Sequence, residues 1–324
     1  MFSVTLAAPP AAFASALRAL VAYTEATKCV AFDFAPGTGL TLSAAYPNVC
    51  VAHAAFPRAL FAHWPADRGA ASCFVASHEV EALLKSLPAS ALGGARGGGG
   101  GAAADAAAPR LTMQLHAGAL HFHVYPAHVD ARHPVARSAA PGISVRLGTV
   151  DAGEVAVTMD APDGGAIGAA LSAPCYVLGA ALDTNAWCEA LAAVEGRGCA
   201  QCCFALTPAA AGGALLSVRG LSSTNGDAVL CNVPCANVSP APTAAAAAAA
   251  APDATRVRYQ LSLLRLSDAL RSRAPRVQLA MARDAYVRLR FEPPLPDAAA
   301  AAAEQWHVHV YVTSQLDDND GEDA

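Results

Sequence analysis

Cysteines form two closely spaced groups in the second half of the chain. One group lies within 199–203 and the other within 231–235, and the candidate ligands among them are Cys199, Cys202, Cys231 and Cys235. Four thiolates at such spacing can hold a tetrahedral zinc ion. Cys202 and Cys203, however, are neighbours in an expected core strand, where adjacent residues point to opposite faces. We therefore favour buried structural thiols and expect no bound metal and no cofactor.

Two histidine pairs have the spacing that places both imidazoles on one face of a strand. They are His121 with His123 and His307 with His309. Metal ligands are known to use this arrangement. Apolar residues alternate with both pairs, as in a strand with one buried face and one polar outer face. We therefore expect exposed strand faces at both pairs rather than metal sites.

The acidic residues give little support for an enzyme. A metal-dependent nuclease needs several carboxylates that converge in one pocket, but the acids are scattered singly except in the run 317–323. The glycine run 97–101 lacks the lysine of a phosphate-binding loop and leads into alanine. No serine, histidine and aspartate fall where the fold would place them together. We therefore expect a non-enzymatic protein.

Composition limits the class of protein. The 324 residues, 54% of them hydrophobic, suffice for two domains with real cores. A net charge of -5 argues against nucleic-acid binding by the whole surface but leaves room for a local basic face. The ten cysteines are typical of unpaired thiols in a reducing compartment. We expect no membrane span and no secretory signal, and therefore an intracellular protein.

Hydrophobic periodicity predicts the elements that would position any site. Apolar residues recur at helical spacing within 10–27, and again within 77–87, where Ser77 is the expected N-cap. Two alternating apolar runs flank Ala117 and Gly118, which predicts a hairpin.

The same order of elements recurs in the second half of the chain. A helix and a strand at 29–34 are matched by a helix at 183–195 and a strand at 199–206. Strands at 39–43 and 214–218 follow in equivalent places. A strand-to-helix segment at 257–271 and strands at 277–281, 286–291 and 306–312 complete the second copy. Both halves read helix, strands, helix, strands, which indicates an internal duplication.

We therefore predict an α+β protein of two similar domains, each with two helices packed on antiparallel sheet. The first domain spans 1–152 and contains a low-complexity loop at 88–109, and a connector follows at 153–174. The second spans 175–316 with low-complexity loops at 239–254 and 297–303, and 317–324 is an acidic tail. Glycine-rich and alanine-rich runs cannot recover their ordering entropy by burial.

Several strings resemble the sliding-clamp family of proliferating-cell nuclear antigen and the checkpoint clamp. They are Lys28-Cys29-Val30, Gly39-Leu40-Thr41-Leu42, and 48–56 with Leu60-Phe61. The run 258–264, followed by Ser267, Ala269 and Leu270, resembles the Rad-one subunit of the nine-one-one clamp more than the replicative clamp. The chain departs from the replicative clamp in its insertions and in a connector without that clamp's acidic and hydrophobic run, which puts docking of partner peptides by that route in doubt.

This resemblance implies a heterotrimeric clamp with Rad-nine-like and Hus-one-like subunits in the nucleus. A clamp loader would place it around double-stranded DNA, without sequence specificity, at damaged or recessed sites. There it would recruit checkpoint signalling and repair factors. The main alternative is a homotrimeric replicative clamp or viral polymerase processivity factor, and a metal-dependent nuclease is a weaker one.

The resemblance also implies which residues face DNA, because the helices of a clamp line its central hole. Basic residues on or beside the predicted helices are the candidates for phosphate contacts: Arg18, Lys28, Lys85, Arg265, Arg271 and Arg273. A solvated polar face would explain each of them equally well. The helix at 183–195 carries no Lys or Arg, which weakens the prediction for that part of the surface.

Overall fold

The chain forms two compact units. The computed structural model describes residues 2–7, 10–25, 27–46, 49–65, 68–87, 110–125, 142–150, 176–208, 214–222, 228–239, 258–265, 270–271, 274–282, 286–292 and 306–313. Described residues of the first unit lie within 1–44, 53–158 and 295–306. Those of the second lie within 45–52, 159–294 and 307–324.

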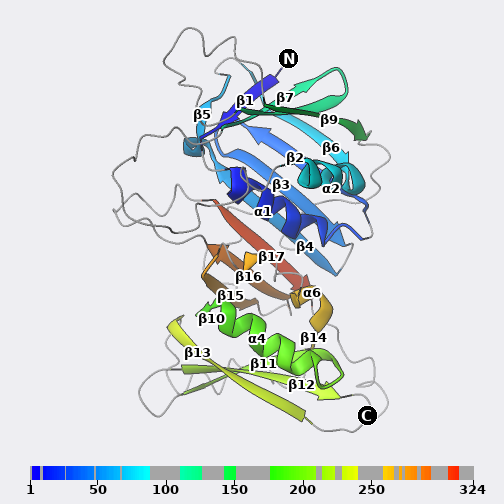
Figure 1. Cartoon of the computed structure of the whole chain (residues 1–324). Helices are drawn as coiled ribbons and strands as arrows, with labels where there is room; N and C mark the ends of the chain where they lie inside the picture. The colour runs from blue at the N-terminus through cyan, green and yellow to red at the C-terminus, as the bar shows by residue number, and fades with distance from the viewer. Residues whose placement is uncertain are drawn as a thin grey trace, which may run out of the picture. The chain divides into compact units, whose positions relative to one another are not determined.

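The first half of the chain contributes nine strands and two α-helices within the described ranges (Figure 1). They are β1 (Phe2–Leu6), α1 (Pro10–Val21), β2 (Cys29–Ala35), β3 (Gly39–Tyr46), β4 (Cys50–Pro57), β5 (Phe61–His63), β6 (Ala71–Ala76), α2 (Ser77–Ser86), β7 (Arg110–His116), β8 (Ala119–Tyr125) and β9 (Ile143–Val150). A single 3-10 turn, Arg58–Leu60, separates β4 from β5.

The second half repeats this plan. Its elements are β10 (Tyr176–Asp183), α4 (Thr184–Glu195), β11 (Cys199–Pro208), β12 (Ala214–Ser222), β13 (Ala228–Ser239), β14 (Tyr259–Gln260), α6 (Leu261–Arg265), β15 (Arg276–Ala282), β16 (Tyr286–Glu292) and β17 (His307–Thr313). The predicted helix and strand positions of this half are thus confirmed.

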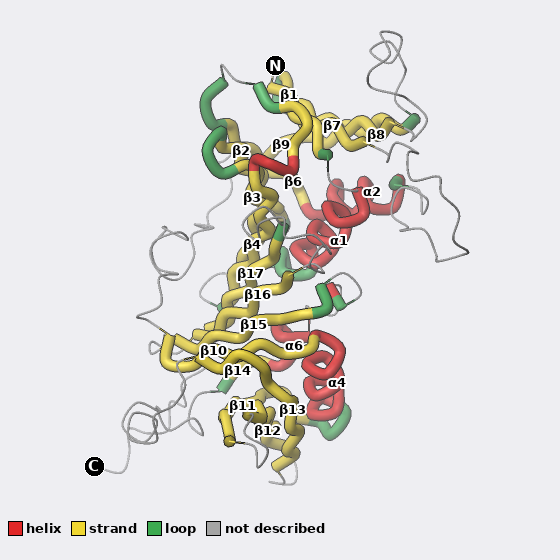
Figure 2. Tube along the Cα trace, turned by 90° about the vertical axis from the view of Figure 1, so that its left-hand side faces the viewer, coloured by secondary structure: helices red, strands yellow, loops and turns green. Residues whose placement is uncertain are grey.

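Strand pairing is antiparallel throughout the described ladders of both units. In the first, β5, β1, β7, β8, β9, β6, β2 and β3 are successive neighbours. In the second, the succession is β14, β11, β12, β13, β10, β15, β16 and β17. In each unit taken by itself, the two helices lie on one face of the sheet (Figure 2). The predicted α+β fold with a duplicated unit is confirmed.

Apolar stripes dock the first-unit helices on their sheet, as the periodicity predicts. Phe13, Leu17 and Leu20 of α1 are fully buried, and Val80 and Leu83 of α2 are equally buried. Fully burying one such side chain stabilises the fold by roughly 1.5–3 kcal/mol. The charged residues Arg18 and Lys85 of the same helices are left exposed.

The hairpin between β7 and β8 is also confirmed. His116 faces Ala119 across a two-residue turn, in which Ala117 and Gly118 have φ values of 49° and 69°. Positive φ at both central residues belongs to the turn type whose twist matches that of the flanking strands.

The expected N-cap of α2 was wrong. Ser77 is the first helical residue, the cap position is Ala76, and no side chain caps the helix. The backbone N–H of Ser77 instead donates to the carbonyl of Lys28 at 2.7 Å. Because that carbonyl satisfies one of the free N–H groups of the first turn, α2 starts without a capping side chain.

Several predictions fall outside the described residues. They concern the connector 153–174, the loops 88–109 and 297–303, the acidic tail, and the loop 239–254 apart from Ser239, which ends β13. The domain limits accordingly stay predictions. Within the described ranges, no helix has the length and apolarity that crossing a membrane requires.

Gly39 is expected to be irreplaceable at the start of β3. Its φ is +104°, and an added Cβ would meet the carbonyl oxygen of Phe56 and lie 2.6 Å from the backbone nitrogen of Arg58. We predict that Gly39→Ala lowers the free energy of unfolding by about 2 kcal/mol or more, because of strain and overpacking. Gly37→Ala is the matched control, since nothing lies within 4 Å of its added Cβ. Equal urea midpoints for the two variants would contradict this.

A buried polar pair should make the first unit sensitive to acid. His53 is 4% exposed, and its Nδ1 lies 2.8 Å from Ser43 Oγ. Burial lowers the pKa of His53 from 6.5 to about 4. Between these values the unfolded chain takes up a proton that the folded chain does not, so this contribution is complete above pH 6.5 and is lost as the pH falls towards 4.

We predict that wild type loses about 3 kcal/mol more than His53→Gln over this interval, since each pKa unit corresponds to about 1.4 kcal/mol. Urea unfolding at a series of pH values measures the difference. Parallel pH profiles for the two proteins would show that His53 is not the responsible group.

Candidate nucleic-acid interface

The helical surface of the first unit carries three exposed bases. Arg18 lies on α1, Lys85 lies in the last turn of α2, and Lys28 follows α1 just before β2. No ion pair between described residues involves any of them. Their charges are therefore available to an anionic ligand.

Lys28 is held in an unusual backbone conformation. Its φ of 54° is left-handed, which few non-glycine residues adopt. Two backbone hydrogen bonds of 2.7 Å fix it, because its N–H donates to Thr24 and its carbonyl accepts from Ser77. Lys28 thus joins the end of α1 to the start of α2, and its side chain leaves from a fixed point between the two helices.

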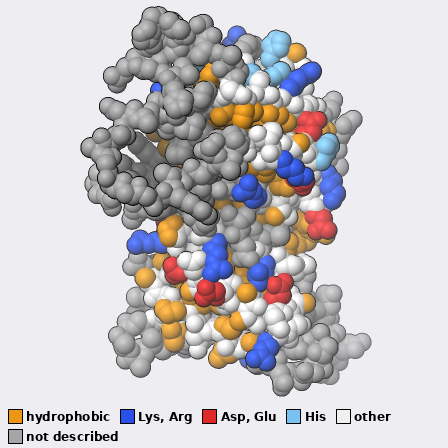
Figure 3. All heavy atoms as spheres, viewed as in Figure 1, with side chains coloured by type: hydrophobic (Ala, Val, Ile, Leu, Met, Phe, Trp, Pro, Cys, Tyr) orange, Lys and Arg blue, Asp and Glu red, His pale blue; other side chains and the backbone are white. Residues whose placement is uncertain are grey.

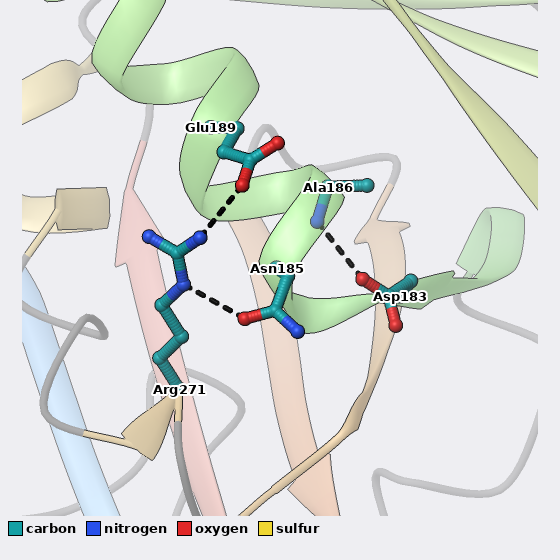
Figure 4. Close-up of polar contacts among 5 residues, drawn as sticks. All are labelled: Asp183, Asn185, Ala186, Glu189 and Arg271. Carbon is teal, nitrogen blue, oxygen red and sulfur yellow. Dashed lines mark hydrogen bonds and ion pairs between the residues drawn. The ribbon is translucent and has the colours of Figure 1, made fainter.

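The main helix of the second unit, α4, is built differently. Asp183 caps it, since Oδ1 accepts a hydrogen bond from the Ala186 N–H at 2.9 Å (Figure 4). Trp187, Leu191 and Val194 are fully buried. Its exposed side includes Asn185, Glu189 and Glu195 and no Lys or Arg, as the sequence indicates.

Two arginines bind these exposed acids. Arg271 donates through Nε to Asn185 Oδ1 at 2.8 Å and through Nη2 to Glu189 Oε1 at 2.7 Å (Figure 4). Arg265, in α6, lies 2.9 Å from Glu195. Asn185 and Glu189 are one turn apart on the same side of α4, which is why one guanidinium reaches both.

The structure thus separates the predicted DNA-facing residues into two kinds. Arg18, Lys28 and Lys85 are exposed and unpaired among the described residues, whereas Arg265 and Arg271 are bound to acids of α4. Arg273 lies outside the described residues. In each unit taken by itself, basic and acidic side chains are interspersed on the part of the face that Figure 3 colours. That any of these residues contacts DNA stays a prediction.

The four candidate zinc ligands lie on two strands that β12 separates. Cys199 and Cys202 are buried on β11, and Cys231 and Cys235 are half-buried on β13. Burial raises the pKa of Cys202, which disfavours the thiolate that a metal needs. No group of three or more potential ligands occurs within the part of the chain that the structure describes.

The two histidine pairs differ from each other. His121 and His123 are half-buried on β8, and His123 Nδ1 lies 2.9 Å from Ser144 Oγ. The expectation of an exposed face was wrong for His309, which is only 3% exposed. Both faces of β17 are buried there, because Val308 and Val310 lie on one side and His309 and Tyr311 on the other.

Comparisons with known proteins identify the fold but not a family. No protein-family profile matches the chain, and no curated protein matches it in sequence. Solved structures of similar fold include the PCNA2-PCNA3 complex from Sulfolobus tokodaii, with a TM-score of 0.61 and 11% identity over 97% of this chain and 100% of that one.

Two further clamps are similar to the same degree. The structure of the C-terminal region of FEN-1 bound to A. fulgidus PCNA gives a TM-score of 0.62 and 11% identity, over 98% of this chain and 99% of that one. Proliferating Cellular Nuclear Antigen from Entamoeba histolytica gives 0.61 and 8%, over 97% and 99%. At such low identity the likeness establishes the fold alone: the chain has the α+β sliding-clamp fold.

Proposed function

We propose that the chain is a non-enzymatic subunit of a ring that encircles double-stranded DNA. The observation that carries this proposal is the duplicated unit, whose likeness to three clamps spans at least 97% of this chain and 99% of each clamp chain. A shared fold over nearly full length leaves little of the chain for a separate catalytic domain. The bases on the first-unit helices supply contacts to phosphate that are independent of sequence.

Two open strand edges supply the means of ring closure. In the first unit, β9 pairs with β8 but meets β6 only at Thr149 and Val150. In the second, β13 pairs with β12 over 228–235 and reaches β10 only at Cys235 and beyond. Residues 143–148 and 228–234 therefore have one edge with no partner strand among the described residues. Such edges readily accept a strand from another chain.

We further propose a Rad-one-like subunit of a heterotrimeric checkpoint clamp in the nucleus, with Rad-nine-like and Hus-one-like partners and a clamp loader. The resemblance of 258–264 supports this assignment. So does α4, which has no Lys or Arg. A homotrimer would present that helix in every subunit, whereas unlike partners can supply basic helices of their own. A loaded ring of this kind would signal damage and recruit repair factors.

Two alternatives remain with less support. A homotrimeric replicative clamp or viral processivity factor has the same fold and would also use the two open edges. A metal-dependent nuclease needs converging carboxylates, and the described residues include no group of three potential ligands.

The solution mass of the purified chain tests the proposal. It is measured alone and in mixtures with Rad-nine-like and Hus-one-like subunits from the same source. We expect a monomer that becomes a one-to-one-to-one complex. A homotrimer formed by the chain alone would favour a replicative or viral clamp, and a monomer that joins neither partner would contradict the checkpoint assignment.

The open edge of β13 provides a variant for the same measurement. Leu230 is 58% exposed on this strand. We predict that Leu230→Lys weakens association about tenfold, because roughly 1.4 kcal/mol of apolar burial is lost at the interface. Ala82→Lys, at an exposed position of α2, is the control and should assemble like wild type. Equal dissociation constants for both variants would exclude β13 from the interface.

A further inference from the structure

We infer that Glu189 and Glu195 of α4 withhold Arg271 and Arg265 from DNA, so that among the described residues predicted to face DNA only those of the first unit are left to contact the phosphate backbone. This inference rests on the proposed clamp function and makes it more specific. It assigns the phosphate contacts to Arg18, Lys28 and Lys85. It also gives the acids of α4 a role, since they set the strength of DNA binding.

The contacts of Arg271 carry the first step. Its guanidinium donates to two side chains of α4, at 2.8 Å to Asn185 and at 2.7 Å to Glu189. These bonds use two of the five N–H groups of the guanidinium, so a phosphate could reach Arg271 either through its remaining N–H groups beside Glu189 or by replacing both bonds. In either case the Glu189 carboxylate, whose side chain is 69% exposed, would lie close to the phosphate. Repulsion between this carboxylate and the phosphate would reduce the attraction between Arg271 and the DNA.

Arg265 repeats this arrangement at the other end of α4. It lies 2.9 Å from Glu195, and the two side chains are 25% and 52% exposed. A carboxylate in the last turn of a helix is unfavourable because the carbonyl groups there carry partial negative charge. Arg265 offsets that interaction, so moving it to a phosphate would restore the unfavourable charge on the helix.

Among the described residues of the first unit, no ion pair gives an equivalent restraint. Glu81 precedes Lys85 by one turn on α2, yet no ion pair joins them. The other acid of that helix, Glu79, is turned towards β9, where its Oε2 accepts a hydrogen bond from the Gly148 N–H at 2.6 Å. No ion pair with another described residue holds Arg18 or Lys28, so among these residues neither has a charged partner to lose on meeting a phosphate.

Exposed ion pairs are individually weak, at about 0.2–1 kcal/mol, so the effect is a balance of charge rather than a rigid lock. Each neutralised phosphate releases counterions, and the logarithm of the binding constant then falls with the logarithm of the salt concentration by about 0.9 per contact. The salt slope therefore counts the bases that reach the DNA.

Binding of a fluorescent duplex by the assembled complex, over about 50–200 mM salt, tests the inference. In Glu189→Gln with Glu195→Gln, the side-chain length is kept while both charges are removed. We expect tighter binding and a slope steeper by up to about 0.9 for each released arginine. Gln at Arg18, Lys28 and Lys85 should weaken binding and flatten the slope by up to about 0.9 per residue.

A matched control separates local release from a change in overall charge. Glu292→Gln removes the acid that lies 3.0 Å from Arg290 on β16, on the strand face opposite the buried Leu289 and Phe291. It should leave the slope unchanged. We expect the midpoint of thermal unfolding of every variant to stay close to that of wild type, since all the replaced side chains are partly or fully exposed.

The outcomes are distinct. Unchanged or weaker binding by the α4 variant, an unchanged slope in the first-unit variant, or an equal gain in Glu292→Gln would each overturn the inference while leaving the clamp proposal intact. No salt-dependent binding by the wild-type complex would overturn the clamp proposal itself.

Discussion

Docking of one aromatic side chain near the start of α1 and of α4 is the interaction on which the packing of each helix against its sheet depends. Phe13 of α1 packs against Phe56 and Phe122, with ring centroids 5.5 and 6.0 Å apart. Trp187 occupies the corresponding place in α4 and packs on Phe204 at 5.5 Å. Aromatic pairs at such separations add about 0.5–1.5 kcal/mol to the burial of their area. Once these rings are fixed, the rotation of each helix about its axis is fixed too.

That rotation decides which charges reach solvent. In α1 it buries Leu17 and leaves Arg18 outside. In α4 it buries Leu191 and leaves Glu189 and Glu195 outside, so two helices with the same packing present opposite charges. The duplication thus conserves the core pattern of the unit, while the outer positions of each copy differ. Any specialisation of this subunit is expected at those outer positions.

Hydrophobic periodicity alone was enough to predict the main helices, the hairpin and the duplicated order of elements. It failed for several strands. The strand β1 alternates buried Phe2, Val4 and Leu6, but five residues give a weak signal. The strand β10 is a nearly continuous apolar run, which periodicity cannot distinguish from a buried helix. Ser77 was a plausible cap by type, but its backbone N–H found a tertiary partner that no local rule contains.

The positions of the basic candidate residues could be predicted from the sequence, but their ion-pair partners could not. Bases beside helices are visible in the sequence, but the partners of Arg265 and Arg271 come from a helix about 70 to 80 positions earlier. One signal was available: a helix with exposed acids and no base of its own needs positive charge from elsewhere. His309 was predicted to be exposed and is buried. The alternation of apolar and polar residues along a strand cannot reveal that both of its faces are covered.

Retention on circular DNA tests the central claim most directly. The assembled complex is incubated with nicked circular DNA, a clamp loader from the same source and ATP, and the DNA-bound fraction is measured at high salt before and after a single cut linearises the circle. A ring that encircles DNA stays on the circle and slides off the cut molecule. Retention that survives linearisation, or no retention on the circle, would contradict it.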